Sequence, residues 1–293
     1  MPFRLILIFL ALITSLHAKS LKPKWELGVV AIFQNEARFL KEWIEFHKLV
    51  GVEHFWLYNN ASKDDYKKVL EPYIKSGLVE LIEWPKTSDN VVEWNNIQSA
   101  AYKNAIKKAQ GRVFWLAIID TDEFLFSPTL TPVPEVLKQY KGKGGVAVNW
   151  LMFGTSGVKT VPEGGLLTEF LTLRGPMDYP ANIHVKTIAN PFFVKDVNNP
   201  HFVIYQDGFD SVTPSGIAFK GPFSPSIEHD LLRINHYWPR DEDFLYAQKI
   251  HRRISWGSAI QDILDKVEAL NQYPDEAILP YVPLLKKAME ATK

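Results

Sequence analysis

The apolar segment 113–119 ends in a cluster of acidic residues, and this junction is the part of the sequence best suited to chemistry. Asp120 and Asp122 are two positions apart, so in an extended segment their side chains point the same way. Burying carboxylates is costly unless a cation or hydrogen bonds neutralise them. Oxygen ligands of this kind suit Mn²⁺ or Mg²⁺, and such an ion can hold a diphosphate. The junction therefore predicts a metal-dependent enzyme that acts on a phosphorylated donor.

Strand-like and helix-like patterns alternate from residue 27 to about 150. Strands are expected over 27–33, 52–58, 78–84, 113–119 and 146–150. Apolar residues recur at helical spacing from Phe39 to Val50, and further helices are expected up to Lys75 and over 94–110. Strands separated by helices indicate βαβ units and a mostly parallel sheet, which is the α/β class.

Polar segments follow three of the expected strands, at 34–36, 59–62 and 120–123. The carboxyl ends of parallel strands meet at one edge of a sheet, and ligands bind there. We therefore expect a set of side chains to face the ligand, a phosphorylated donor: Asn35, Glu36, Asn59 and Asn60. Amide groups can read a base edge or ribose hydroxyls, but the same residues also form turns and cap helices.

The later half of the chain is less regular, with Gly, Pro and Asn frequent between residues 154 and 225. Strands are expected over 184–188 and 231–238. Helices are expected over 241–254, 258–270 and 275–289. We find no internal repeat and no clear linker, so residues 24–293 are interpreted as one catalytic domain. Its parts are a nucleotide-binding half at about 27–125, an acceptor half at about 126–255 and C-terminal helices at about 256–293.

The composition excludes several kinds of site. The 293 residues include no cysteine, so disulfides, thiolate nucleophiles and cysteine-bound zinc are ruled out. Lys and Arg together number 33, as do Asp and Glu. This balance gives no electrostatic case for a nucleic-acid partner.

The first 18 residues have the pattern of a targeting segment. Arg4 precedes the apolar run 5–13, and Ala18 ends a short region suited to cleavage. The run is shorter than the roughly 20 residues of a membrane span. The pattern predicts a signal peptide, or a short signal anchor if it is not cleaved. It places the chain in the secretory pathway or the bacterial envelope, with membrane association through the N-terminus as the anchored alternative.

Several segments form an ordered set of motifs across most of the chain. In order they are 30–36, 42–47, 51–60, Gln98, 115–124, 149–154, 186–188 and 235–237. The set resembles GT-A glycosyltransferases, and more narrowly glycosyltransferase family 92. The resemblance implies a Rossmann-like, mostly parallel central sheet flanked by helices. It also implies transfer of a sugar from a UDP-sugar to a glycan or other hydroxyl acceptor, with Mn²⁺ or Mg²⁺ and with inversion. Galactose is the sugar that the resemblance suggests.

The resemblance also assigns roles to individual residues. Asp122 is the first choice as a direct metal ligand, and Asp120 would bind the metal or the donor ribose. His236, in the motif Asn235-His236-Tyr237, is the candidate third ligand, with His184 as its competitor. A lone histidine in an apolar strand is otherwise more often a core residue. Lys186 would neutralise a phosphate.

Two further roles are less well defined by the sequence. Gln98 lies on a helical face, where it either contacts the donor or only hydrogen-bonds within the fold. An inverting transferase needs a general base for the acceptor hydroxyl, which is usually Asp or Glu. The candidates in the irregular half are Glu163, Asp178, Asp207, Asp210 and Asp230. We select Asp210 and Glu163. Trp150, Phe153, Tyr179 and Trp238 are candidates for stacking on a sugar.

Two other functions compete with this interpretation. Haloacid-dehalogenase phosphatases also place Asp-x-Asp after an apolar strand. That family, however, expects small residues where Glu123 and Phe124 stand here. The second alternative is a secreted protein that keeps the GT-A fold and binds glycans without catalysis.

Overall fold

The computed structural model describes residues 22–291, and strands alternate with helices up to residue 118 as predicted. The strands are β1 (Trp25–Phe33), β2 (His54–Asn59), β3 (Val79–Glu83) and β4 (Val113–Ile118). The helices between them are α1 (Ala37–Leu49), α2 (Tyr66–Lys75) and α3 (Val91–Ala109). β1 pairs in parallel with β2 and β4, and β2 pairs in parallel with β3. The carboxyl ends of β1, β2 and β4 therefore lie along one edge, as expected.

The sheet becomes mixed beyond β4. Strand β8 (Val185–Ala189) lies between β4 and β6 (Gly145–Met152) and is antiparallel to both. The full order is β12-β11-β6-β8-β4-β1-β2-β3, where β11 is Ser211–Val212 and β12 is Ala218–Phe219. The expectation of a mostly parallel sheet thus holds for the first half only. A long loop leads into β8, and no helical crossover constrains the strand to run parallel.

A strand that the sequence analysis did not predict starts inside the acidic cluster. This strand, β5 (Glu123–Phe126), pairs antiparallel with β13 (Arg233–His236), which in turn pairs in parallel with β6. Residues 120–122 form the turn from β4 into β5. The prediction that Asp120 and Asp122 point the same way from an extended segment is therefore wrong. Phe124 and Phe126 are buried in the core, so the chain turns sharply to bring them there.

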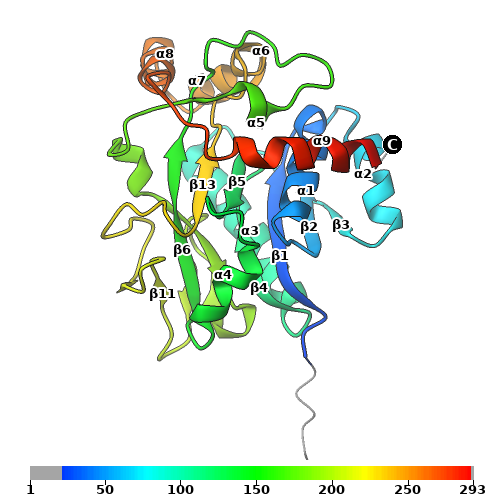
Figure 1. Cartoon of the computed structure of the whole chain (residues 1–293), viewed down its shortest axis with the longest axis vertical. Helices are drawn as coiled ribbons and strands as arrows, with labels where there is room; N and C mark the ends of the chain where they lie inside the picture. Colours follow the sequence, from blue (N-terminus) through cyan, green and yellow to red (C-terminus); the bar gives the residue numbers. More distant parts are fainter. Residues whose placement is uncertain (1–21, 292–293) are drawn as a thin grey trace, which may run out of the picture.

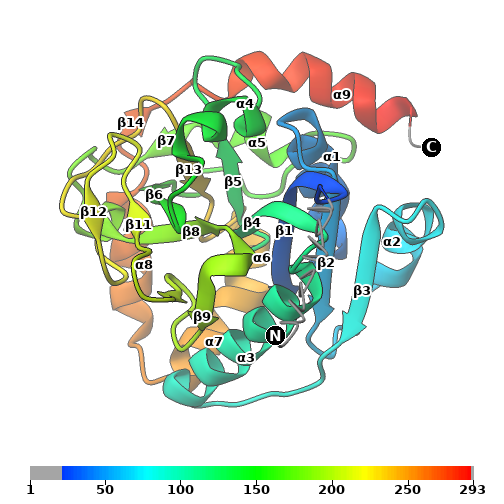
Figure 2. The same ribbon diagram turned by 90° about the horizontal axis from the view of Figure 1, so that it is seen from below.

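Helices cover both faces of the sheet (Figures 1 and 2). α1, α2 and the C-terminal helix α9 (Val282–Ala291) pack on one face, with Trp43, Phe46 and Leu285 in the core. α3 packs on the other face, with Tyr102 inside. The predicted α/β class with a central sheet and C-terminal helices is confirmed.

The chain after β13 crosses the end of the sheet that lies at the top of Figure 1. It forms α6 (Glu242–Phe244), a π-helical turn (Leu245–Lys249), α7 (Ile250–Ser255) and α8 (Ile260–Ala269). Shorter elements complete the fold: α4 (Val133–Leu137), α5 (Leu167–Phe170), β7 (Leu173–Arg174), β9 (Val194–Asp196), β10 (Ile204–Tyr205) and β14 (Tyr273–Pro274).

The predicted targeting segment 1–18 lies outside the described residues. Within residues 22–291, no helix has the length and apolar character needed to cross a membrane.

Two side chains of α1 fix the start of β5. The Trp43 Nε1–H donates to the Glu123 carbonyl oxygen at 2.8 Å. The Leu125 N–H donates to His47 Nε2 at 3.2 Å, which leaves Nδ1–H to donate to the Trp43 carbonyl oxygen at 2.8 Å. Because β5 follows the acidic turn directly, these bonds help to hold that turn in place.

The His47 contact predicts a pH dependence of stability. Burial lowers the pKa of His47 to about 3 from its ordinary value of 6.5. The neutral ring therefore stabilises the fold above about pH 6.5, and this stability is lost as the pH falls toward about 3. The loss is about 1.4 kcal/mol per pH unit at most.

Urea unfolding of the wild type and of His47→Gln, measured from pH 7 to pH 4.5, checks this expectation. Gln can accept the Leu125 hydrogen bond but does not titrate, so its free energy of unfolding should depend less on pH. His251→Gln, at an exposed position, is the control and should follow the wild type. Equal pH slopes in wild type and His47→Gln would contradict the expectation.

Candidate functional site

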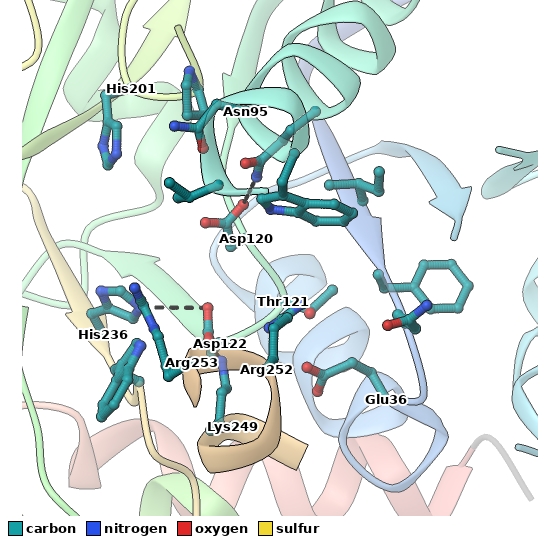
Figure 3. Close-up of a pocket in the computed structure, with 18 of the residues that line it drawn as sticks. Glu36, Asn95, Asp120, Thr121, Asp122, His201, His236, Lys249, Arg252 and Arg253 are labelled. Atoms are coloured by element: carbon teal, nitrogen blue, oxygen red, sulfur yellow. Dashed lines mark hydrogen bonds and ion pairs between the residues drawn. The ribbon is translucent and has the colours of Figure 1, made fainter. Parts of the chain in front are cut away.

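A pocket of about 250 Å³ opens at the carboxyl ends of β1 and β4. Its walls come from the segment after β1, the first turns of α3, the β4–β5 turn, β8, β13 and α7 (Figure 3). The predicted site residues that line it are Glu36, Gln98, Asp120, Asp122, Lys186 and His236. The fold thus brings together side chains that are up to 200 positions apart in the chain.

Asp120 is held on the α3 and β8 side of the pocket. Its Oδ1 accepts hydrogen bonds from Gln98 Nε2 and the Tyr102 hydroxyl, both at 2.8 Å. Its Oδ2 accepts from Lys186 Nζ at 2.8 Å. Burial disfavours the charged carboxylate, but the Lys186 ammonium outweighs burial and lowers the pKa of Asp120. Asp120 is therefore an ionised and fixed acceptor at the pocket wall.

The Asp122 side chain contacts Lys249 and His236 rather than the groups that hold Asp120. Its Oδ2 accepts a short hydrogen bond from Lys249 Nζ, and its Oδ1 lies 3.5 Å from His236 Nε2. Burial raises the pKa of this carboxyl, but Lys249 and His236 outweigh burial and hold it well below its ordinary value. The pKa of His236 is lowered by burial, so its ring is neutral near pH 7. A carboxylate and a neutral imidazole at one wall suit a divalent cation.

Glu123 is the first residue of β5 and does not line the pocket itself. Its side chain is fully buried, and its Oε2 accepts from the Asp120 backbone N–H at 2.9 Å. Oε1 has no hydrogen-bond partner among the described residues. Burial raises the pKa of Glu123 well above its ordinary value, and the nearby Asp120 and Asp122 charges add to this effect, while Lys186 opposes it.

One set of ligand atoms among residues 22–291 is compact enough for a metal ion. Asp122, Glu123 and His236 each offer one atom, and the three atoms lie within 4.8 Å of one another. Glu123 Oε1 accepts no hydrogen bond from the described residues and lies 3.6 Å from Lys186 Nζ, and the oxygen-plus-imidazole donor set fits Mn²⁺ or Mg²⁺. Asp120, a predicted metal ligand, is not in this group, because the turn directs it toward Lys186 instead.

Asn35, Asn59 and Asn60 do not line this pocket. The Asn59 amide donates to the Tyr66 hydroxyl and to Glu83, and that of Asn60 donates to the carbonyl oxygens of Trp84 and Lys86. Asn35 has φ +55°, and its Oδ1 accepts from the Lys63 N–H at 2.8 Å. All three side chains therefore hydrogen-bond within the fold. This agrees with the structural role that the sequence left open as the alternative to ligand binding.

Glu36 does reach the pocket, but it is paired. Its carboxylate accepts a hydrogen bond from Arg240 Nη2 at 2.6 Å, and both side chains are buried. The predicted contact of Glu36 with a nucleotide therefore competes with a buried ion pair.

The two residues selected as general bases lie elsewhere. Asp210 pairs with Lys220 at 3.3 Å and lines a separate hollow formed by residues 202–211 and 219–221. Glu163 is exposed on the loop before α5 and does not line the pocket. The structure therefore does not bring either carboxylate to the predicted site. Sequence could not reveal this, because local patterns do not show which distant segments pack against the β4–β5 turn.

A group of pocket residues on the helical segment between β13 and α8 was not predicted from the sequence. Lys249, Arg252 and Arg253 all line the pocket, and Trp94 and Trp256 stand beside them. The spacing i, i+3, i+4 in an expected helix is the signal that predicts a shared face. Of the aromatic residues predicted to stack on a sugar, Trp150 and Trp238 line the pocket, whereas Phe153 is buried in the core.

The ion pair between Lys186 and Asp120 predicts a large effect on stability. Lys186→Met should lower the free energy of unfolding by about 3–5 kcal/mol, because it leaves buried carboxylates without a cation. Lys220→Met is the matched control, since its ammonium also pairs with an aspartate but is 80% exposed. It should cost about 1 kcal/mol or less. Urea unfolding of both variants measures the difference, and equal losses would show that the Lys186 pair is not the strong contact inferred here.

Comparison with known proteins gives a consistent result. Residues 29–212 match Glycosyltransferase family 92. A glycosyltransferase family 92 protein of Ricinus communis is 30% identical over 236 residues, covering 78% of this chain and 38% of the relative. One from Oryza sativa subsp. japonica is 27% identical over 213 residues, covering 71% of this chain and 32% of the relative. The chain thus spans about a third of the length of these relatives.

Solved glycosyltransferase structures show a partial likeness. S. aureus TarS 1–349 in complex with UDP has a TM-score of 0.37 and 13% identity, with 57% of this chain and 47% of that chain covered. Glucosyl-3-phosphoglycerate synthase from Mycobacterium tuberculosis, in complex with Mn²⁺, UDP and glucosyl-3-phosphoglycerate, has a TM-score of 0.31 and 18% identity, covering 58% of each chain. The family match covers more than half of the chain, and the Ricinus relative is 30% identical over 78% of it. These two findings are enough to assign the family. The chain belongs to glycosyltransferase family 92.

Proposed function

We propose that the chain transfers a sugar from a UDP-sugar to a hydroxyl group of a glycan acceptor, with inversion. The observation that carries this proposal is the pocket at the carboxyl ends of β1 and β4, where Asp122 and His236 face each other in a family 92 chain. Galactose is the first donor sugar to test, on the family resemblance alone.

Asp122 and His236, with Glu123 behind them, are the residues that would hold Mn²⁺ or Mg²⁺. When bound, the ion neutralises charge on the departing nucleoside diphosphate. Asp122 is already ionised and His236 is neutral, which are the forms that bind a metal. A cation at this place would also favour the charged form of Glu123, which burial otherwise disfavours.

The remaining pocket residues fit donor binding. Asp120 is a fixed carboxylate whose contacts with Gln98, Tyr102 and Lys186 set its direction, so it can accept a hydrogen bond from a ribose hydroxyl. Trp150 and Trp238 present aromatic surface to the pocket, against which the apolar face of a sugar can pack.

The proposal predicts loss of transfer in Asp122→Asn. This change removes the charge but keeps the shape and one hydrogen-bond acceptor for Lys249. Release of UDP from a panel of UDP-sugars with glycan acceptors and Mn²⁺ measures activity. The rate should fall about 100-fold or more, as for other groups that stabilise charge in a transition state.

Asp196→Asn, at a half-exposed aspartate paired with Lys103, is the control and should keep full activity. Full activity in Asp122→Asn would remove Asp122 from the site. If the wild type binds glycans but releases no nucleotide from any donor, the non-catalytic glycan-binding alternative replaces the transferase.

We propose further that residues 1–18 direct the chain into the secretory pathway or bacterial envelope, with membrane anchoring where they are retained. The basis is Arg4 followed by the apolar run 5–13. Cell fractionation of the expressed full chain, followed by N-terminal sequencing, should find it exported. A cytosolic product that begins at Met1 would contradict this.

A further inference from the structure

Three cations on the helical segment between β13 and α8 face the pocket. Lys249 ends the π-helical turn, and Arg252 and Arg253 follow in α7. The spacing of i, i+3 and i+4 places all three on one side of the helix, and Figure 3 shows them rising from it toward Asp122 and His236. π-Helical turns occur frequently at functional sites.

The pocket has more positive than negative charge. Each carboxylate that lines it already has a cationic partner: Arg240 for Glu36, Lys186 for Asp120 and Lys249 for Asp122. Arg252 and Arg253 make no ion pair and donate no side-chain hydrogen bond within residues 22–291. They therefore add two positive charges to the pocket, and the carboxylate that attracts Arg253, Asp122, is already paired with Lys249.

Aromatic rings, rather than carboxylates, hold these two guanidinium groups. Arg252 lies 5.8 Å from the Trp94 ring centroid and 5.5 Å from that of Trp256. Arg253 lies 5.3 Å from the ring centroids of both Trp238 and Trp256. The rings restrict the side chains but use none of their N–H donors, so the donors stay available to a ligand.

Arg253 is also half-buried. Burial and the adjacent Arg252 charge both lower the pKa of its guanidinium. Two neighbouring like charges at a pocket wall are unfavourable unless an anion joins them. Guanidinium groups bind phosphate oxygens through paired hydrogen bonds, and a diphosphate carries the charge that this wall lacks.

We propose that Arg252 and Arg253 bind the diphosphate of the nucleotide-sugar donor, so that the nucleotide binds without a divalent cation. The inference rests on the proposed function, because it assumes a nucleoside diphosphate donor. It adds a second source of positive charge, on α7 and close to Asp122 and His236. The metal then serves the transfer step and is not needed to capture the donor.

Calorimetric titration of the protein with UDP and with uridine, in EDTA and in Mn²⁺, tests the proposal. In EDTA, the wild type should bind UDP about 10- to 100-fold more tightly than uridine, the gain that charge-assisted hydrogen bonds provide. The double variant Arg252→Ala/Arg253→Ala should lose most of this difference while its affinity for uridine stays the same. Unchanged uridine binding would show that the pocket is intact.

Two further variants test whether the cations must lie in the pocket and whether positive charge alone is enough. Lys107→Ala/Lys287→Ala removes two exposed cations outside the pocket and should bind UDP as the wild type does. Arg252→Lys/Arg253→Lys keeps the charge but loses the paired geometry, and should fall between the wild type and the double alanine variant.

The outcomes distinguish this inference from the proposed function. If the double alanine variant keeps full UDP affinity in EDTA, or if wild-type binding of UDP requires Mn²⁺, the inference is wrong and the donor assignment stands. If the wild type binds UDP under neither condition, the proposed donor is wrong, and the inference falls with it.

Discussion

Buried carboxylates must be neutralised, and this constraint organises the structure around the β4–β5 turn. Asp120, Asp122 and Glu123 lie within four residues, and Asp122 and Glu123 are among the buried side chains. Their cations come from distant parts of the chain, Lys186 from β8 and Lys249 from the helical segment after β13. Because each ion pair joins the turn to another element, the site and the packing of the C-terminal half depend on each other.

The same ion pairs give the two aspartates different environments. Asp120 has three donors and is fixed toward α3 and β8, whereas Asp122 is shared between Lys249 and His236. A dication held by Asp122, Glu123 and His236 would add positive charge on the Asp122 side of the turn, where Lys249 already pairs with the carboxylate.

Polarity at the ends of strands did not by itself identify ligand-binding residues. Asn59 ends β2 and donates to the Glu83 carboxylate of β3, whereas Asn60 follows β2 and donates to the carbonyl oxygens of Trp84 and Lys86 in the loop after β3. The pocket instead takes its cationic wall from a helix far along the chain. Turn atoms next to a buried strand need hydrogen bonds before any ligand arrives, and nearby amides supply them first.

Local patterns in the sequence were enough to predict the α/β class, the four parallel strands, the acidic junction after β4 and the family resemblance. Hydrophobic periodicity and turn residues are local signals, so they can be read without the fold. The packing of distant segments, in contrast, makes residues 120–122 a turn into β5, makes β8 antiparallel and brings Glu123 to Asp122 and His236. It also decided that Asp210 and Glu163 lie outside the pocket and that Arg252 and Arg253 lie in it. These outcomes depend on which distant segments pack together and on where buried charges find partners, and neither is encoded in local spacing.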